Sequence, residues 1–200
     1  MADIRMTDEE IRELLVSTGA IRHGHFKLTS GRHSDTYIQC ARVLEYPTLT
    51  MLLAEEAVAK LPKDLKVDIV ASPALGGILF GFAVASALDA TMIFSERVDG
   101  AMVFRRSFEV PDGARILVVE DVVTTGGSVR EICDLIEADK GEVVGVVSMI
   151  DRADSICFDV PYYPLLRIKA PSWQPEDCNL CQQGIEISSP GSRAILQSSQ

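Results

Sequence analysis

Five short apolar runs in the second two-thirds of the chain alternate with longer segments that have helical spacing. The runs lie at 67–72, 91–94, 116–121, 143–151 and 163–169, and the clearest helical segments lie at 76–88 and 127–140. Short, continuously apolar runs are typical of strands that are covered on both faces. Strands that alternate with helices pair in parallel, because each helix returns the chain to the starting edge of the sheet. We therefore expect an α/β fold with a central, mainly parallel sheet flanked by helices.

The first third of the chain has a different pattern. Thr7 to Glu10 match a capping box, in which a threonine and a glutamate three residues later satisfy each other's backbone amides. The expected elements are a helix over 7–18, a hairpin or strand-loop-strand within 24–40, and a helix over 47–61. We interpret the chain as one domain over 1–200, with a small N-terminal hood at about 1–45, a core at about 46–170 and a polar, irregular tail at 171–200.

Length and composition narrow the class of protein. The chain has 200 residues, of which 47% are hydrophobic, which suits one globular domain. Its formal net charge of −10 argues against a nucleic-acid binder, which usually carries a basic face. No apolar stretch is long enough to span a membrane, and the acidic N-terminus does not resemble a signal peptide. We expect a cytoplasmic protein whose five cysteines form no disulfide framework.

Residues 116–128 read ILVVEDVVTTGGS, a buried strand that ends in two acids and runs into a turn of hydroxyls and glycines. Ligands of open parallel sheets bind at the carboxyl ends of strands. The glycines allow backbone amides to converge, and the following helix adds partial positive charge, which suits a phosphate. Glu120 and Asp121 would repel that phosphate, so they suit a ribose diol or a divalent cation. The pattern predicts a sugar-phosphate site; the alternative is a solvated strand end before a capped helix.

This stretch closely resembles the phosphoribosyl-pyrophosphate (PRPP) signature of type I phosphoribosyltransferases, and the wider resemblance covers roughly residues 20–155. The resemblance implies that Glu120 and Asp121 hold the ribose hydroxyls and that the turn holds the 5′-phosphate. The implied PRPP contacts in this segment are Glu120, Asp121, Val122, Val123, Thr124, Thr125, Gly126, Gly127 and Ser128.

A second loop, SPALGGILFG at 72–81, resembles the pyrophosphate loop of the same family. By that resemblance Ala74, Gly76 and Gly77 would contact the diphosphate, whose charge suits backbone amides just before a helix. The alternative is a turn of small residues selected for packing.

Two further segments resemble orotate phosphoribosyltransferases. FKLTSGRHSDTY at 26–37 is similar to the segment that covers the base in those enzymes, and MIDR at 149–152 is similar to a strand end that holds orotate. The resemblance implies that Thr124 and Arg152 contact orotate and that Tyr37 lies near the base. A guanidinium can pair bidentately with the orotate carboxylate. The alternative for Arg152 is an ion pair with Asp151 or Asp154.

Three departures from the usual orotate pattern mark a divergent, short-loop bacterial branch. Gly76 stands where many of these enzymes have a lysine in the pyrophosphate loop, and Thr29 stands where a base-covering lysine is common. The mobile loop, FSERVDGAMVFRR at 94–106, is short and has neither lysine nor histidine. Arg97, Arg105 and Arg106 are the candidates to replace these cations.

The resemblance implies transfer of a phosphoribosyl group from PRPP to orotate, giving orotidine 5′-monophosphate and pyrophosphate in pyrimidine biosynthesis. Asp121, Glu120 and Arg97 are the expected catalytic residues, and residues 97–106 would act as a lid. Mg²⁺ is the expected cofactor, held mainly through PRPP without dedicated protein ligands. The family implies a homodimer. Two alternatives remain: a purine or xanthine phosphoribosyltransferase, and a non-catalytic PRPP-sensing regulator.

Cys178 and Cys181 form a C-x-x-C pair, which is half of a common zinc pattern. No second pair exists, although His23, His25 or a symmetry-related copy could complete a site. We interpret these two residues as reduced cysteines in a polar tail. The other three cysteines, Cys40, Cys133 and Cys157, lie in apolar contexts and are expected in the core. His33 is expected either to face substrate or to lie at the surface.

Overall fold

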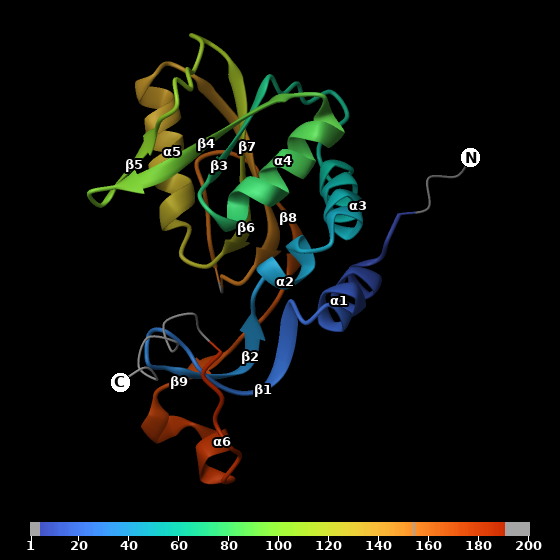
Figure 1. Cartoon of the computed structure of the whole chain (residues 1–200), viewed down its shortest axis with the longest axis vertical. Coiled ribbons are helices and arrows are strands. Elements are labelled where there is room, and N and C mark those ends of the chain that lie inside the picture. Colours follow the sequence, from blue (N-terminus) through green and yellow to red (C-terminus); the bar gives the residue numbers. More distant parts are fainter. Residues whose placement is uncertain (1–4, 154, 191–200) are drawn as a thin grey trace.

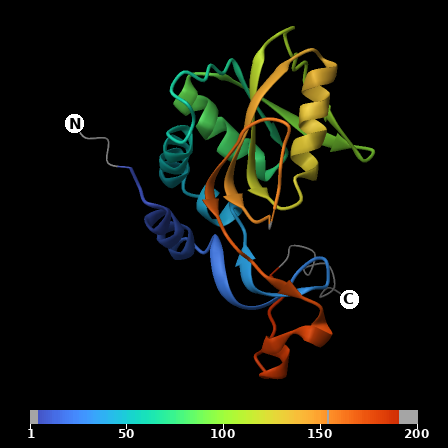
Figure 2. The same ribbon diagram turned by 180° about the vertical axis from the view of Figure 1, so that it is seen from behind.

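The computed structural model describes residues 5–153 and 155–190. It has a core built around a six-stranded sheet and a smaller hood below it (Figures 1 and 2). The core sheet has the order β5-β4-β3-β6-β7-β8, and only the β4–β5 pair is antiparallel. Its strands are β3 (Ile69–Pro73), β4 (Thr91–Val98), β5 (Ala101–Phe104), β6 (Arg115–Val123), β7 (Glu142–Asp151) and β8 (Tyr162–Arg167). The predicted α/β class and mainly parallel sheet are confirmed.

Both faces of this sheet are buried, as the continuously apolar runs predicted. Helices α3 (Pro47–Val58) and α4 (Gly76–Leu88) cover one face, and α5 (Gly127–Ala138) covers the other (Figure 1). Successive residues of one strand face opposite layers, so Leu117 packs with the α3–α4 layer and Ile116 packs with the α5 layer. The sheet therefore carries two hydrophobic cores at once.

The strand order reverses direction between β3 and β6. From β3 the chain proceeds outward to β4 and β5, whereas from β6 it proceeds to β7 and β8 on the other side. The loops that follow β3 and β6 therefore diverge and leave a crevice at the carboxyl ends of the two strands. The sequence motifs at 72–81 and 116–128 fall on these two loops.

The hood is a three-stranded sheet with the order β1-β2-β9. It consists of the predicted hairpin, β1 (Ile21–Lys27) and β2 (His33–Ile38), together with β9 (Ser172–Trp173) from the C-terminal segment. A short helix, α2 (Ala41–Leu44), follows β2, and a 3₁₀ turn at Pro175–Asp177 and the short helix α6 (Asn179–Gln182) follow β9. Part of the segment expected to be an irregular tail is therefore ordered: β9 pairs with β2 and Ser188 bridges to Phe26, although most residues within 172–188 are exposed.

The hood lies at the edge of the core where β6 and β7 end (Figure 1). Chain connections join the two parts twice, once from β2 into α2 and once from β8 into β9. A further contact joins them where the Cys40 Sγ lies 3.8 Å from the Asp121 carbonyl oxygen. The hood therefore stands over the crevice between β3 and β6.

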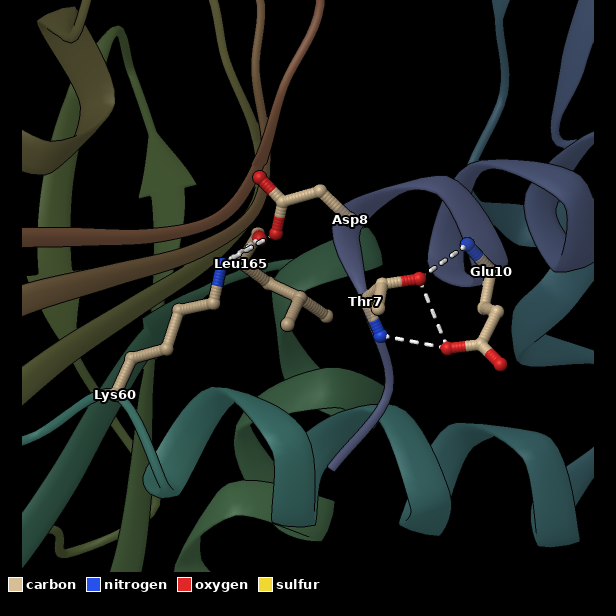
Figure 3. Close-up of polar contacts among 5 residues, drawn as sticks. All are labelled: Thr7, Asp8, Glu10, Lys60 and Leu165. Carbon is tan, nitrogen blue, oxygen red and sulfur yellow. Dashed lines mark hydrogen bonds and ion pairs between the residues drawn. The ribbon is translucent and has the colours of Figure 1, made fainter. Parts of the chain in front are cut away.

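Helix α1 (Asp8–Ser17) begins at the predicted capping box. The Thr7 hydroxyl accepts a hydrogen bond from the Glu10 amide at 3.2 Å, and the Glu10 carboxylate accepts one from the Thr7 amide at 2.7 Å (Figure 3). Lys60 ties this helix to the core, because its Nζ donates to the Asp8 carboxylate and to the Leu165 carbonyl oxygen (Figure 3). Across the described residues, no helix is long and apolar enough to cross a membrane.

Candidate active site

The acid pair lies at the end of β6, next to the reversal of strand order. Glu120 is buried and Asp121 is half-buried. The Asp121 amide donates to Glu120 Oε1 at 3.1 Å, and the Val122 amide donates to Asp121 Oδ1 at 2.9 Å. These bonds orient both carboxyl groups at the end of the strand.

Burial, followed by a side-chain hydrogen bond to Asp121 and the negative charge of that neighbouring carboxylate, raises the pKa of Glu120 to about 9. Glu120 therefore keeps its proton at neutral pH. The buried Cys40 thiol close by has a pKa raised well above its ordinary value, first by burial and then by Asp121 and Glu120. The acid pair consequently carries less negative charge than its sequence indicates, which favours the approach of an anionic ligand.

The TTGGS turn forms a hollow of about 50 Å³ immediately after the acid pair. Gly126 has a φ of +73°, and an added Cβ there would lie 2.4 Å from Ile156 Cδ1, so only glycine fits. Arg130 braces the turn, because its Nη1 donates to the Thr125 carbonyl oxygen at 2.8 Å. The hollow is lined by Glu120, Val122, Val123, Thr124, Thr125, Gly126, Gly127, Ser128 and Val129. Helix α5 begins at Gly127, so its N-terminus adds partial positive charge to this hollow.

The loop after β3 meets the acid pair directly. A Cβ added to Gly76 would lie 2.3 Å from Asp121 Oδ2, and one added to Gly77 would lie 3.1 Å from Glu120 Oε1. No side chain of any size fits at Gly76 without moving Asp121. The two glycines therefore allow the N-terminus of α4 to approach the carboxyl groups, with Ala74 just before them in the same loop.

Arg152 follows β7, the neighbour of β6, and its amide donates to the Val123 carbonyl oxygen at 2.9 Å. The carboxylate of Asp151 accepts instead from Arg167 Nε at 3.2 Å and from the Ala153 amide at 2.9 Å. Partial burial lowers the pKa of the Arg152 guanidinium. Within residues 5–153 and 155–190 no carboxylate pairs with Arg152, and Asp154, the other partner considered, lies outside the described residues.

The remaining predicted base contacts lie on different elements. Thr124 is exposed in the turn after β6. Tyr37 is half-buried on β2 of the hood, and its ring packs against Phe26 with centroids 5.5 Å apart. Turn, strand end and hood thus each supply one of the three residues.

Arg97 has a different environment from the one expected. It lies on the β4–β5 hairpin, where its Nη2 bonds Glu131 Oε1 of α5 at 2.9 Å and its Nη1 bonds the Gly100 carbonyl oxygen. Arg106 likewise bonds Glu96 at 2.8 Å. In this conformation both cations are paired with nearby acids, and within the described residues Arg97 bonds Glu131 and Gly100 rather than the acid pair.

Cys40 was not identified from the sequence as a neighbour of the site. Its position depends on the path from the hood into α2, which brings residue 40 against residue 121. A local sequence pattern cannot predict a contact between residues that are 81 positions apart. Of the other cysteines, Cys133 is partly buried as its apolar context indicated, whereas Cys157 is exposed and the prediction for it is wrong.

Comparison with known proteins agrees with this geometry. The family model described as "Phosphoribosyl transferase domain" matches residues 48–160, more than half of the chain. The chain belongs to the phosphoribosyltransferase family. The matched residues contain both loops of the crevice, but they do not include the strands of the hood.

Two curated relatives match almost the entire chain. An orotate phosphoribosyltransferase of a Thermoanaerobacter species is 44% identical over 189 residues, covering 94% of this chain and 99% of that protein. The orotate phosphoribosyltransferase of Thermotoga maritima is 47% identical over 186 residues, covering 92% and 99%. Among solved structures, the orotate phosphoribosyltransferase of Mycobacterium tuberculosis in complex with inorganic phosphate has a TM-score of 0.65 at 27% identity, covering 80% of this chain and 95% of that one.

The raised pKa of Glu120 predicts a specific dependence of stability on pH. The folded protein keeps this proton up to about pH 9, whereas the ordinary pKa of 4.5 applies to the unfolded chain. Between these values the folded state binds more protons, so stability falls as pH rises, with a slope of up to about 1.4 kcal/mol per pH unit. Glu120→Gln should abolish this loss, as measured by urea unfolding between the two pH values.

Asp64→Asn is the matched control, because Asp64 is an exposed acid outside the crevice. Its unfolding free energy should follow the wild-type curve. If wild type and Glu120→Gln give parallel curves over the whole range, Glu120 is ionised in the folded protein and the prediction is wrong.

Proposed function

We propose that this protein is an orotate phosphoribosyltransferase, which transfers the phosphoribosyl group of PRPP to orotate and releases pyrophosphate. The observation that carries the proposal is the contact of Gly76 and Gly77 with Asp121 and Glu120 across the crevice. It joins a diphosphate loop, a diol-binding pair and a phosphate turn into one site. The full-length relatives named above supply the identity of the base.

In this proposal PRPP lies across the reversal of strand order. Its 5′-phosphate occupies the turn at 124–128, where the α5 N-terminus and backbone amides offset the negative charge. Its ribose hydroxyls bind Glu120 and Asp121, and its diphosphate faces Ala74, Gly76 and Gly77. Every group of PRPP then has a partner of suitable chemistry.

Orotate would lie between this site and the hood. Arg152 is well suited to its carboxylate, because the guanidinium is partly buried and no described acid neutralises it. Thr124 would contribute a hydrogen bond and Tyr37 would lie over the base. The hood would exclude water, which could otherwise hydrolyse PRPP.

The reaction breaks the bond between the anomeric carbon and the pyrophosphate oxygen and forms a bond from that carbon to the orotate ring nitrogen, whose N–H proton is released to the pyrophosphate or to water. Positive charge develops on the ribose ring, which gains oxocarbenium-ion character, and negative charge develops on the leaving pyrophosphate. Asp121 and Glu120 hold the ribose in place while the amides of the β3–α4 loop accept the leaving group. Arg97 could assist only after leaving Glu131, which would accompany movement of the 97–106 lid.

The donor set is compatible with Mg²⁺. The Asp121 carboxylate would supply oxygens, with the protonated Glu120 beside it, and no third metal-ligating side chain joins them in the part of the chain that the structure describes. Such a pair suits an ion that would be held mainly by substrate oxygens and water, with Asp121 as the residue that could bind it. Bound there, Mg²⁺ would supply charge neutralisation to the diphosphate.

A homodimer is the expected assembly. Leu75, Leu79 and Phe82 are 83%, 55% and 64% exposed, and all three project from the pyrophosphate loop or the outer side of α4. An apolar surface of this kind next to the site suits a partner subunit.

A cytoplasmic location is the expected one. The five cysteines form no disulfide bonds, as is usual for proteins in the reducing cytoplasm.

The two alternative functions have less support. A purine or xanthine enzyme would share the PRPP site, but the full-length relatives named above carry the orotate name. A PRPP-sensing regulator of nucleic acids would require a basic face, which a net charge of −10 does not favour.

The decisive experiment offers purified protein PRPP and Mg²⁺ with orotate, uracil, adenine, guanine, hypoxanthine or xanthine in separate assays. We expect consumption of orotate alone, followed spectroscopically, with release of pyrophosphate. Turnover of a purine would overturn the assignment of the base. Binding of PRPP without turnover of any base would favour the regulator.

Arg152→Ala should raise the KM for orotate about 10- to 100-fold, because a charge-assisted bond contributes roughly 1.5–3 kcal/mol. The KM for PRPP should change little. Arg152→Lys should fall between wild type and alanine, because lysine keeps the charge but loses the bidentate geometry. Arg12→Ala, on the surface of α1, serves as the control. Equal changes in both KM values would contradict a role in holding the base.

Gly76→Ala should reduce kcat/KM about 100-fold, because the new methyl group must displace the Asp121 carboxylate. The free energy of unfolding should change far less, since Gly76 lies at the start of a helix that tolerates alanine. Ser86→Ala, on the exposed side of the same helix, should behave like wild type. Retention of near-normal turnover in Gly76→Ala would show that Asp121 need not keep its position.

A further inference from the structure

Four metal-ligating side chains converge in the hood, far along the chain from the acid pair. They are His25 on β1, His33 on β2, and Cys178 and Cys181, which flank the start of α6. One ligand atom from each lies within 4.8 Å of all the others. Three of the four residues are buried, and only Cys181 is exposed. The sequence interpretation placed both cysteines in a polar tail, but Cys178 is fully buried.

The distances match the edges of a coordination tetrahedron. With zinc–nitrogen bonds of about 2.0–2.1 Å and zinc–sulfur bonds of about 2.3 Å, a regular tetrahedron has nitrogen–nitrogen edges of about 3.4 Å and nitrogen–sulfur edges of about 3.6 Å. The His25 Nε2 to His33 Nδ1 distance is 3.2 Å. The three nitrogen–sulfur distances recorded are 3.4, 3.6 and 3.2 Å.

Hydrogen bonding alone accounts poorly for this arrangement. The His25 Nδ1 lies 2.8 Å from the Ile185 carbonyl oxygen, which can only accept, so Nδ1 carries the proton of the neutral ring. Its Nε2 then has a single lone pair, yet His33, Cys178 and Cys181 all approach that atom. One lone pair cannot accept three hydrogen bonds. It can bind an ion that the other three groups also bind, and the Ile185 carbonyl then fixes the ring.

Local backbone structure explains why His25 faces the cluster. Strand β1 has a bulge: His23 pairs with Thr36 and Phe26 pairs with Ser34, so two residues, 24 and 25, oppose one. A bulge redirects side chains out of the regular alternation. His25 is buried as a result, whereas His23, another ligand considered from the sequence, is exposed and lies outside the cluster. His33 is buried at the start of β2, so the prediction that it faces substrate or solvent is wrong.

We propose that His25, His33, Cys178 and Cys181 form a structural Zn²⁺ site. Two thiolates and two imidazoles in a tetrahedron are a ligand set typical of zinc, and four protein ligands leave no open position for substrate. The oxygen-rich crevice at Asp121 suits a different class of ion, so the two sites do not compete. The zinc site is independent of the identity of the base.

The site would hold the C-terminal segment on the hairpin. Around it, the Ser188 amide donates to the His25 carbonyl oxygen at 2.8 Å, and the Lys27 amide donates to the Ser188 carbonyl oxygen at 2.9 Å. The hood strands have only seven, six and two residues, which is too little to bury a large core. Small units of this size commonly depend on a metal.

The first test is elemental analysis of the full chain, purified without affinity metal and dialysed against a weak chelator. About one zinc per chain is expected in wild type, and Cys178→Ser and Cys181→Ser should each retain less than about a fifth of that. Cys157→Ser is the matched control, because Cys157 is an exposed thiol outside the cluster, and it should retain wild-type zinc.

Cobalt substitution keeps the proposal testable if a variant fails to fold. Wild-type protein stripped with a strong chelator and reconstituted with Co²⁺ should show the visible absorption of tetrahedral, thiolate-ligated cobalt, and excess Mg²⁺ should not remove it. Zinc removal should also lower the melting temperature, and added Zn²⁺ should restore it. Wild-type protein that neither holds zinc nor gives this cobalt spectrum would overturn the proposal.

Discussion

The approach of two glycines to two carboxyl groups is the constraint on which the rest of the site depends. Gly76 and Gly77 can touch Asp121 and Glu120 only because β3 and β6 are hydrogen-bonded neighbours at the reversal of strand order. That pairing in turn requires strands that are apolar on both faces, so that helices can cover each side. The continuous hydrophobic runs at 69–71 and 116–119 are therefore as necessary to the site as the polar residues that follow them.

Charge is distributed in a way that reconciles an acidic protein with an anionic substrate. Burial keeps Glu120 protonated, so the strand end is less negative than two adjacent acids would be in water. Arg152 lies partly buried beside β6 without a described acidic partner, whereas Arg97 and Arg106 are paired with Glu131 and Glu96. Arg152 thus has no described acid beside it in this conformation, whereas Arg97 and Arg106 are each held by a glutamate.

Features within one short stretch of sequence were largely predictable. The capping box, the two βα turns and the strand-helix alternation each depend on neighbouring residues, and each is found in the structure. The hood was less predictable, because its third strand pairs Ser34 with Ser172 across 138 positions (172 − 34) of the chain. The contact of Cys40 with Asp121 and the position of His33 beside Cys181 have the same origin. The bulge at 24–25 changes which side chains of β1 face inward, so the sequence did not indicate which histidine is buried.

The hood pairs the first two strands, β1 and β2, with β9, the last strand of the described residues. This order has a consequence for synthesis on the ribosome. Strands β1 and β2 emerge early, but β9 and the residues around α6 follow only after the whole core sheet has been made. The β1–β2 hairpin therefore lacks its third strand, and the edge of β2 stays unpaired, while β3 to β8 form the core sheet. The core can reach its final pairing before the hood closes, so the part that covers the crevice is the last to be completed during biosynthesis.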